Sequence, residues 1–303
     1  MTAKIACVLF ESPPPLEEVE HALAPLGGRR IALAAGAIAL PAEAVAQPSD
    51  AVAQPSDAIV LPDEATVEVV AAPWPGAEGD SGSLARAVAQ RWRWEGAPAA
   101  AERHRAFVRV RLPERGAPGD RDAAAGLWRL TDVARALLAL PGALACFFPA
   151  GEALRSPDFV EESSSHHRKH GLPAFDLWMN LRMFKPDAAP GWTTFDVVGL
   201  SQLDLDDLEI CFEGPFEPPD RFLFNTAHYL LQKGPVIKTG HTIDGPGGRW
   251  RAAQQEKPLA PPSRRTLRFF REGARPPQAL LGEGPAGAEV TVAPSRGKKN
   301  EPS

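Results

Sequence analysis

Residues 4–28, KIACVLFESPPPLEEVEHALAPLGG, indicate the fold class of this chain. Residues 5–10 form an uninterrupted apolar run of strand length. The segment after them starts with prolines and glutamates and ends with two glycines, which is the pattern of a helix with its start and its end. Its apolar side chains recur every three or four residues, as expected for one buried face: Leu16, Val19, Leu23 and Leu26. The stretch therefore predicts a strand followed by an amphipathic helix.

The rest of the first half continues this alternation of strand and helix. Apolar segments of strand length occur at 29–40, 66–72 and 105–113, and a helical pattern occurs at 83–94. The order strand, helix, two strands, helix, strand is that of a ferredoxin-like βαββαβ unit. We therefore expect residues 1–115 to form one α+β half with a mostly antiparallel sheet.

The chain after residue 115 shows a similar order with added strands. Helical patterns occur at 123–140 and 218–234, and strand patterns occur at 143–148, 173–184, 192–200, 207–213 and 235–244. We expect residues 116–272 to form a second ferredoxin-like α+β half, in which 235–244 is the last core strand. Proline, glycine, alanine and charged residues prevail from Gly273 onward, which predicts a disordered tail at 273–303.

Composition excludes several classes of partner and compartment. The formal net charge of −5 gives no attraction to phosphate backbones or anionic lipid, so we expect neither nucleic acid nor a membrane surface as a partner. The three cysteines lie far apart in apolar segments and form no C-x-x-C pair, which is typical of buried thiols in a reducing compartment. The apolar run near the start is too short for a secretory signal. The sequence therefore predicts a cytoplasmic protein.

Residues 161–170, EESSSHHRKH, contain three of the seven histidines. On a helix, His166 and His170 would share one face and could offer two imidazoles to zinc, and Glu162 would extend that face. The local sequence contains no third ligand at a fixed spacing, and the neighbouring serines and basic residues are typical of a solvated helix end. We therefore expect these histidines to face water, and we predict no metal and no cofactor.

The best candidate catalytic residues are His228, His241 and Glu209, all in the second half. A histidine pair near a carboxylate at a sheet rim could support hydrolysis or proton transfer. The simpler interpretations are a core histidine bonded to a carbonyl group, and a charged residue on the polar side of an alternating strand. Nucleophile and phosphate-binding motifs such as G-x-S-x-G and the P-loop are absent from the sequence. The candidate binding residues are Trp178, Tyr229 and Asp244.

A series of motifs resembles one bacterial family. The segments ACVLFESPPPLEEVEHAL, AAPWP, LWRLTDVARALLALPGALACFF, DLWMNLRMF, VVGLSQLDLDDLEICF, NTAHYLL and TGHTID occur in this order between about residues 5 and 245. In this order they are similar to the family called domain of unknown function 4261, whose members are bacterial and cytoplasmic. The resemblance implies no established activity and no catalytic residues.

Two classes of function follow from these observations. The first is a non-enzymatic binding or interaction module, such as an immunity-like or accessory factor with a protein partner, which the lack of an assembled catalytic motif favours. The alternative is a hydrolase or metal-dependent enzyme with a histidine and glutamate site in the second half. The sequence leaves enzymatic activity and oligomeric state open, and it favours the binding module.

Overall fold

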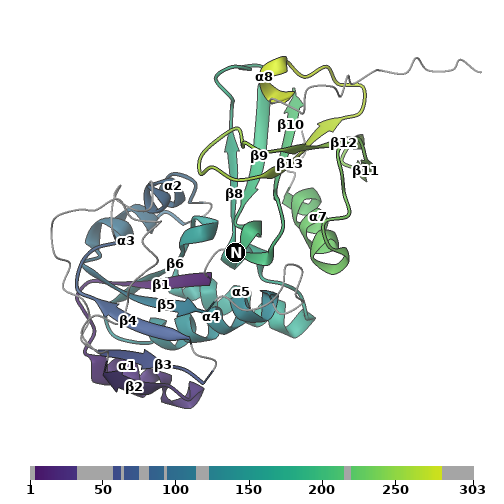
Figure 1. The fold of residues 1–303 in the computed structure, drawn as a ribbon. Coiled ribbons are helices and arrows are strands. Elements are labelled where there is room, and N and C mark those ends of the chain that lie inside the picture. Colours follow the sequence, from purple (N-terminus) through teal and green to yellow (C-terminus); the bar gives the residue numbers. More distant parts are fainter. Residues whose placement is uncertain are drawn as a thin grey trace, which may run out of the picture.

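The computed structural model describes residues 4–32, 57–62, 65–74, 82–91, 94–113, 123–214 and 220–281. Within these residues the strands form two sheets, one in each of the two bodies seen in Figure 1. The first sheet is antiparallel throughout and has the spatial order β2 (Arg29–Ala32), β3 (Asp57–Val60), β4 (Thr66–Val70), β5 (Ala106–Leu112), β1 (Lys4–Phe10), β6 (Ala143–Phe148) and β7 (Ala153–Arg155).

Helices cover both faces of the first sheet, which explains why its central strands are apolar along their whole length. Val8 and Phe10 belong to the main core, to which α1 (Leu16–Leu23), the short turn η1 (Ala24–Leu26) and α4 (Ala123–Leu138) contribute. Cys7 and Leu9 point to the opposite face, because side chains alternate along a strand. There they pack with α2 (Ser83–Ala89) and α3 (Ala97–Arg103).

The second sheet has the spatial order β11 (Thr242–Gly245), β12 (Gly248–Gln255), β13 (Thr266–Arg271), β10 (Asp207–Glu213), β9 (Trp192–Val198) and β8 (Asn180–Phe184). Its pairs are antiparallel except for β10 and β13, which run parallel. Helix α7 (Asp220–Lys233) covers one face through Phe222 and Leu223. Residues 256–265 and α8 (Gln278–Leu281) cover the other face, where Leu259 and Leu280 pack against it.

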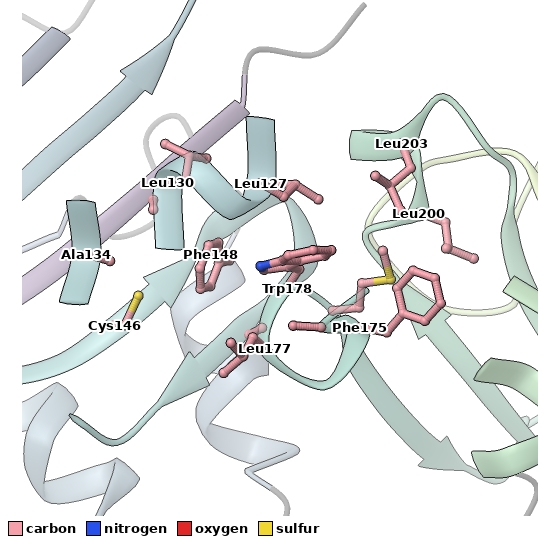
Figure 2. Packing of buried hydrophobic residues seen from close by; sticks show 14 of the residues in the cluster. Leu127, Leu130, Ala134, Cys146, Phe148, Phe175, Leu177, Trp178, Leu200 and Leu203 are labelled. Carbon is pink, nitrogen blue, oxygen red and sulfur yellow. The ribbon is translucent and has the colours of Figure 1, made fainter. Parts of the chain in front are cut away.

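The two sheets share one core, and Trp178 lies at their junction (Figure 2). This tryptophan ends the short helix α6 (Phe175–Trp178), is fully buried, and donates a hydrogen bond of 2.9 Å from Nε1 to Thr131 Oγ1. The chain reaches it from the first sheet through α5 (Pro157–His170), whose first turn is capped by the Ser156 side chain. The junction therefore depends on packing between segments from both sheets.

Two 3-10 turns meet closely beside this tryptophan. They are η2 (Pro149–Gly151), between β6 and β7, and η3 (Leu200–Leu203), after β9. A Cβ atom at Gly199 would lie 2.6 Å from the Gly151 Cα, and one at Gly151 would lie 1.9 Å from the Trp178 carbonyl oxygen. Only glycine fits at both positions, so the backbones of the two sheets approach each other without intervening side chains.

The predicted α+β class and the mostly antiparallel sheets are confirmed, but the ferredoxin-like order of the halves is not. In a ferredoxin-like unit the first strand would pair with the third strand of the same half. Here β1 lies between β5 and β6, because α4 returns the chain to the free side of β1. Strands β6 and β7 therefore belong to the first sheet, and the change of sheet falls after residue 155 and not at the expected boundary of 115/116.

Three local predictions also differ from the structure. Residues 173–184 form α6 followed by β8, not one strand, because the short helix turns Trp178 into the junction. The expected core strand at 235–244 begins only at Thr242 and lies at the sheet edge, and β13 takes the central place. Part of the expected disordered tail forms α8, where Leu280 is fully buried. Residues 282–303 of that tail lie outside the described residues.

Among the described helices, none combines the length and the apolar composition needed to cross a membrane.

Candidate functional site

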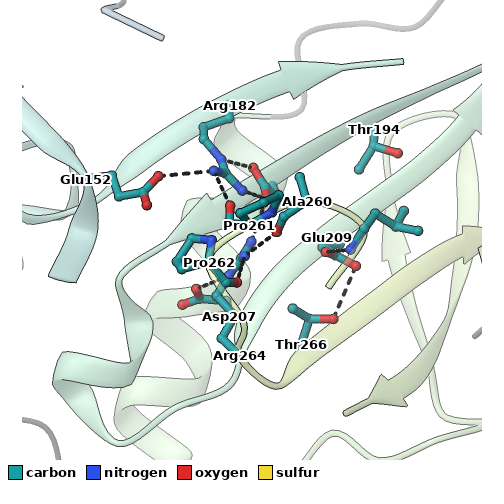
Figure 3. Close-up of polar contacts among 12 residues, drawn as sticks. Glu152, Arg182, Thr194, Asp207, Glu209, Ala260, Pro261, Pro262, Arg264 and Thr266 are labelled. Atoms are coloured by element: carbon teal, nitrogen blue, oxygen red, sulfur yellow. Dashed lines mark hydrogen bonds and ion pairs between the residues drawn. The ribbon is translucent and has the colours of Figure 1, made fainter. Parts of the chain in front are cut away.

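A network of charged side chains lies on the covered face of the second sheet and reaches the first sheet (Figure 3). Four carboxylates and four guanidinium groups of the described residues take part. Six of them form one chain of contacts: Arg86, Glu152, Arg182, Asp196, Arg264 and Asp207. Glu209 and Arg268 form a neighbouring pair on the same face, because Glu209 lies opposite Asp196 in the sheet. The two signs of charge therefore balance within the network.

Glu209 on β10 is fully buried in this network. Its Oε2 accepts hydrogen bonds from Arg268 Nε at 2.6 Å and from Thr266 Oγ1 at 3.2 Å, and its Oε1 accepts one from the Leu259 backbone N–H at 3.0 Å. The alternation along β10 places Glu209 on the polar side, as the sequence indicates. That side is covered by residues 256–265, so the carboxylate does not face water.

Arg182 on β8 connects the two sheets. It donates to both carboxylate oxygens of Asp196, at 2.9 and 2.5 Å, to Glu152 at 3.1 Å, and to the Pro261 carbonyl oxygen at 2.6 Å. Burial alone lowers the pKa of Arg182, but the hydrogen bonds to Asp196 and the neighbouring carboxylates outweigh burial and raise it. The guanidinium group is therefore charged at every accessible pH, and it holds its carboxylate partners in place.

Asp207, at the start of β10, stabilises the turn that follows β9. Its carboxylate accepts hydrogen bonds from the backbone N–H groups of Gly199 at 3.1 Å and Leu200 at 2.7 Å, and Arg264 Nε lies 2.6 Å from its Oδ2. Burial raises the pKa of Asp207 to about 7, and the Arg264 charge and the two amides oppose this rise. Asp207 is thus the network member whose charge can change near neutral pH.

The network has the properties of a structural element. Each of its four carboxylates contacts at least one arginine, and each also contacts a second arginine or a backbone N–H group. Several donors hold each carboxylate in a fixed position away from solvent. The arrangement can join the sheets, and its buried charges remain paired.

The three candidate catalytic residues occupy separate environments. The His228 Nε2 atom on α7 lies 2.6 Å from Gln232 Nε2, and the imidazole lines a cavity of about 470 Å³ with His167 and Trp128. His241 lies in the exposed turn before β11, where its Nδ1 is 3.4 Å from the Lys238 backbone N–H. None of the described contacts of either histidine involves Glu209, so the structure does not bring the three residues together.

Two of the candidate binding residues line one groove, and the third lies elsewhere. Tyr229 on α7 and Asp244 on β11 line a cavity of about 440 Å³ between the helix and the β11–β12 hairpin. Its other lining residues come from the same elements and the turn between them: Arg221, Phe222, Asn225, Thr226, Ile237, Ile243, Gly245 and Pro246. Trp178 is completely buried at the sheet junction, so it belongs to the core and not to a binding surface.

The histidines of residues 161–170 lie in the last turns of α5. His166 and His170 are exposed, as expected, with ring centres 4.5 Å apart. His167 points inward, and its Nε2 lies 2.9 Å from Asp176 Oδ1, while Ser163 donates to the same carboxylate at 2.9 Å. No group of three or more potential ligands among the described residues has the arrangement of a metal site.

Most of the network residues were not identified from the sequence. The available signal was an arginine inside an otherwise apolar strand, in NLRMF at 180–184 and in TLRFF at 266–270. A buried arginine needs a carboxylate partner, so each such arginine predicts an acidic residue on a neighbouring strand. Strand pairing supplies these partners: Arg182 lies opposite Asp196, and Arg268 lies opposite Glu209.

The model of one protein family, described as Domain of unknown function (DUF4261), matches residues 196–270. The match confirms the resemblance indicated by the sequence motifs over this segment, which begins and ends later than the motifs do. The segment contains the groove residues Tyr229 and Asp244. It also contains five of the eight residues of the charged network, namely Asp196, Asp207, Glu209, Arg264 and Arg268. Searches among curated proteins and among solved structures give no significant match.

Proposed function

We propose that this protein, whose residues 196–270 match the DUF4261 family, is a non-enzymatic binding module that holds a protein partner in the groove between α7 and the β11–β12 hairpin. The observation that carries this proposal is the meeting of Tyr229 and Asp244 at one groove with an apolar floor. A preformed concave surface that combines apolar and polar side chains is typical of ligand and peptide sites.

The floor of the groove is rigid. Phe222 packs against Trp250 with ring centres 5.9 Å apart and against Phe269 at 5.6 Å in an edge-to-face arrangement. Trp250 and Phe269 are fully buried in the second sheet, and Trp250 Nε1 is held by the Pro246 carbonyl oxygen at 3.1 Å. Because the floor is formed by core side chains, a partner would bind without first ordering it.

The rim supplies the groups that would recognise a partner. Tyr229, the only tyrosine of the chain, is 48% exposed although it lies beside this apolar floor. Tyrosine is enriched among the residues that contribute most to protein interfaces. Asp244 is exposed and has no ion pair within the described residues. The partner is therefore a protein segment with one apolar side chain for the floor and one basic side chain for Asp244.

The alternative of a hydrolase or metal-dependent enzyme receives no support from a specific contact. Glu209 is buried and paired with Arg268, while His228 and His241 lie in different surroundings. A proton transfer site needs its groups within hydrogen-bond reach of one reacting atom. Binding of a partner at Tyr229 and Asp244 needs no rearrangement of the core, so we prefer the binding module.

Site-specific photo-crosslinking in the native host tests the proposal. A benzophenone amino acid placed at Tyr229 should give a defined crosslinked protein, and one placed at the exposed Phe159 on α5 should not. The crosslinked protein would then be purified, and its affinity for the wild-type chain would be measured. Tyr229→Ala and Asp244→Lys should each weaken binding by about tenfold or more, since each removes a side chain that recognises the partner.

Glu162→Lys provides a control with the same change of charge as Asp244→Lys, on an exposed position of α5. It should leave the affinity unchanged. The proposal is wrong if the two groove variants bind the crosslinked protein as tightly as this control does.

A further inference from the structure

The last two turns of α5 contain a pair of exposed imidazoles that the proposed groove does not use. His166 and His170 lie four residues apart on this helix, with ring centres 4.5 Å apart and an angle of 37° between the rings. We infer that this pair is a bidentate site for a late divalent transition metal ion, of the class of Ni²⁺, Cu²⁺ and Zn²⁺.

The separation of the rings fits two ligands of one ion. With metal–nitrogen bonds of about 2.1 Å and an angle of about 90–110° at the metal, the centres of two imidazoles lie roughly 4.5–5 Å apart. A spacing of four residues places both side chains on one face of a helix, which is the local geometry that zinc enzymes use for their histidine pairs. The helix thus holds the rings near the required distance before any ion binds.

The hydrogen bonds of the pair leave nitrogen lone pairs for a metal. His170 Nδ1 lies 2.8 Å from the His166 carbonyl oxygen, and a carbonyl can only accept, so Nδ1 carries the proton. The Nε2 atom of His170 therefore has a free lone pair, as in most metal sites, where the second ring nitrogen is held by a carbonyl or a carboxylate. Within the described part of the chain, no hydrogen bond involves the His166 ring.

The position on the helix also favours a cation. Helix α5 ends at His170, and Gly171 caps it in the left-handed conformation. The last turn carries the negative end of the helix dipole, where positive charge is stabilised. Of the two basic residues between the histidines, Arg168 is directed to Asp132 at 2.5 Å and stacks on Trp128 at 4.4 Å, so it does not compete for the same space.

The site is open and has two protein ligands. His167 is unavailable, because its Nε2 contacts Asp176 and its Nδ1 is buried. Glu162 lies one turn before His166 and is exposed, so its carboxylate is within helical reach of the same face. Imidazole ligands select the late transition metals, whereas Mg²⁺ and Ca²⁺ prefer oxygen. The remaining coordination positions are open to water.

Nickel binding to the full chain, purified without a polyhistidine tag, tests the site. Titration calorimetry at neutral pH should give one Ni²⁺ per chain, and MgCl₂ should give no signal. His166→Ala and His170→Ala should each weaken Ni²⁺ binding by about tenfold or more, because either change removes the chelate.

His21→Ala is the matched control, because His21 is an exposed histidine near the end of α1 and has no histidine four residues away. Its Ni²⁺ affinity should equal that of the wild type. Both α5 positions are exposed, so the variants should keep the wild-type helical circular dichroism, which is recorded for each. A His166→Ala/His170→Ala double variant that is folded and binds Ni²⁺ within about twofold of the wild type would overturn the inference.

Discussion

Glu152 of the first body and Arg182 of the second sheet form a buried ion pair that joins the two sheets, with Glu152 Oε2 and Arg182 Nη1 3.1 Å apart. Glu152 follows η2 in the left-handed backbone conformation, with φ of 48°, and it is 1% exposed. Its other carboxylate oxygen accepts from Arg86 Nε at 2.7 Å. One carboxylate thus holds an arginine from α2 and an arginine from β8 at the junction.

Removal of the Arg182 charge should destabilise the protein strongly. Arg182→Met leaves Asp196 and Glu152 buried with one fewer positive partner each, and an uncompensated buried charge costs about 3–5 kcal/mol. We expect the free energy of unfolding in urea to fall by about 3 kcal/mol, since Arg264 and Arg86 remain as partners. Arg135→Met, at the more exposed pair with Glu161, should change it by less than about 1 kcal/mol. Equal effects of the two variants would contradict a structural role for the network.

The close approach of the sheets should tolerate no side chain at Gly151. A Cβ atom there would lie 1.9 Å from the Trp178 carbonyl oxygen, which is backbone and cannot move aside. Gly151→Ala should therefore lower the free energy of unfolding by about 3 kcal/mol, measured in urea. Gly191→Ala is the control, because its nearest neighbour is a Glu213 side-chain oxygen 3.7 Å away. It should stay within about 1 kcal/mol of the wild type. A well-tolerated alanine at position 151 would show that the turns can separate.

Stability should fall as the pH rises toward 7 because of Asp207. Burial raises the pKa of Asp207 to about 7 in the folded protein, whereas an unfolded aspartate titrates near pH 3.9. Between these values the folded state binds more protons than the unfolded state, so raising the pH lowers the free energy of unfolding. The contribution is at most about 1.4 kcal/mol per pH unit.

Asp207→Asn should remove this dependence, because the amide does not titrate. Urea unfolding of both proteins at several pH values between 4.5 and 7.5 would measure the difference between the two slopes. If the wild type and the variant show the same slope in this range, Asp207 stays charged throughout.

The ionised Asp176 carboxylate should stabilise the folded protein, and this contribution should be lost at acid pH, whereas the contribution of Asp207 is lost as the pH rises. Burial raises the pKa of Asp176, but the hydrogen bonds and charge of His167 and the Ser163 hydroxyl outweigh burial and lower it. A lowered pKa in the folded state gives stability that is present above pH 4 and is lost as the pH falls through the folded pKa. Asp176→Asn should therefore cost about 1 kcal/mol at pH 6, because the side chain is partly exposed, and should cost less at pH 2.5. Glu162→Gln, at an exposed position, should show no such difference between the two pH values.

Local periodicity in the sequence is sufficient to predict many of the individual elements. The apolar spacing of residues 16–26 predicts a helix that the structure divides into α1 and η1, and the alternation in 207–213 predicts β10. The α+β class follows from these elements alone. The order of the strands does not follow from them. Each edge of β1 can pair with any strand that the chain brings beside it, and here the connection through α4 places β6 there.

The candidate site likewise combines residues that the sequence identifies with an arrangement that only the folded structure shows. The sequence identifies Tyr229 and Asp244 separately, but their common groove depends on how the β11–β12 hairpin packs on α7. His228 precedes Tyr229 by one residue and lines a different cavity, because neighbouring positions on a helix point about 100° apart.

The amino-acid pattern establishes which side of each helix and strand is apolar, since this depends on residues a few positions apart. It predicts that Glu209 and Leu208 lie on opposite faces of β10, and this is what the structure shows. It does not say what covers each face. Contacts between residues far apart in the chain bring 256–265 over Glu209 and Arg268 beside it, and they convert a side expected to face water into a buried ionic network. Burial depends on this long-range packing, so the functional meaning of a charged residue can be assigned only after the chain is folded.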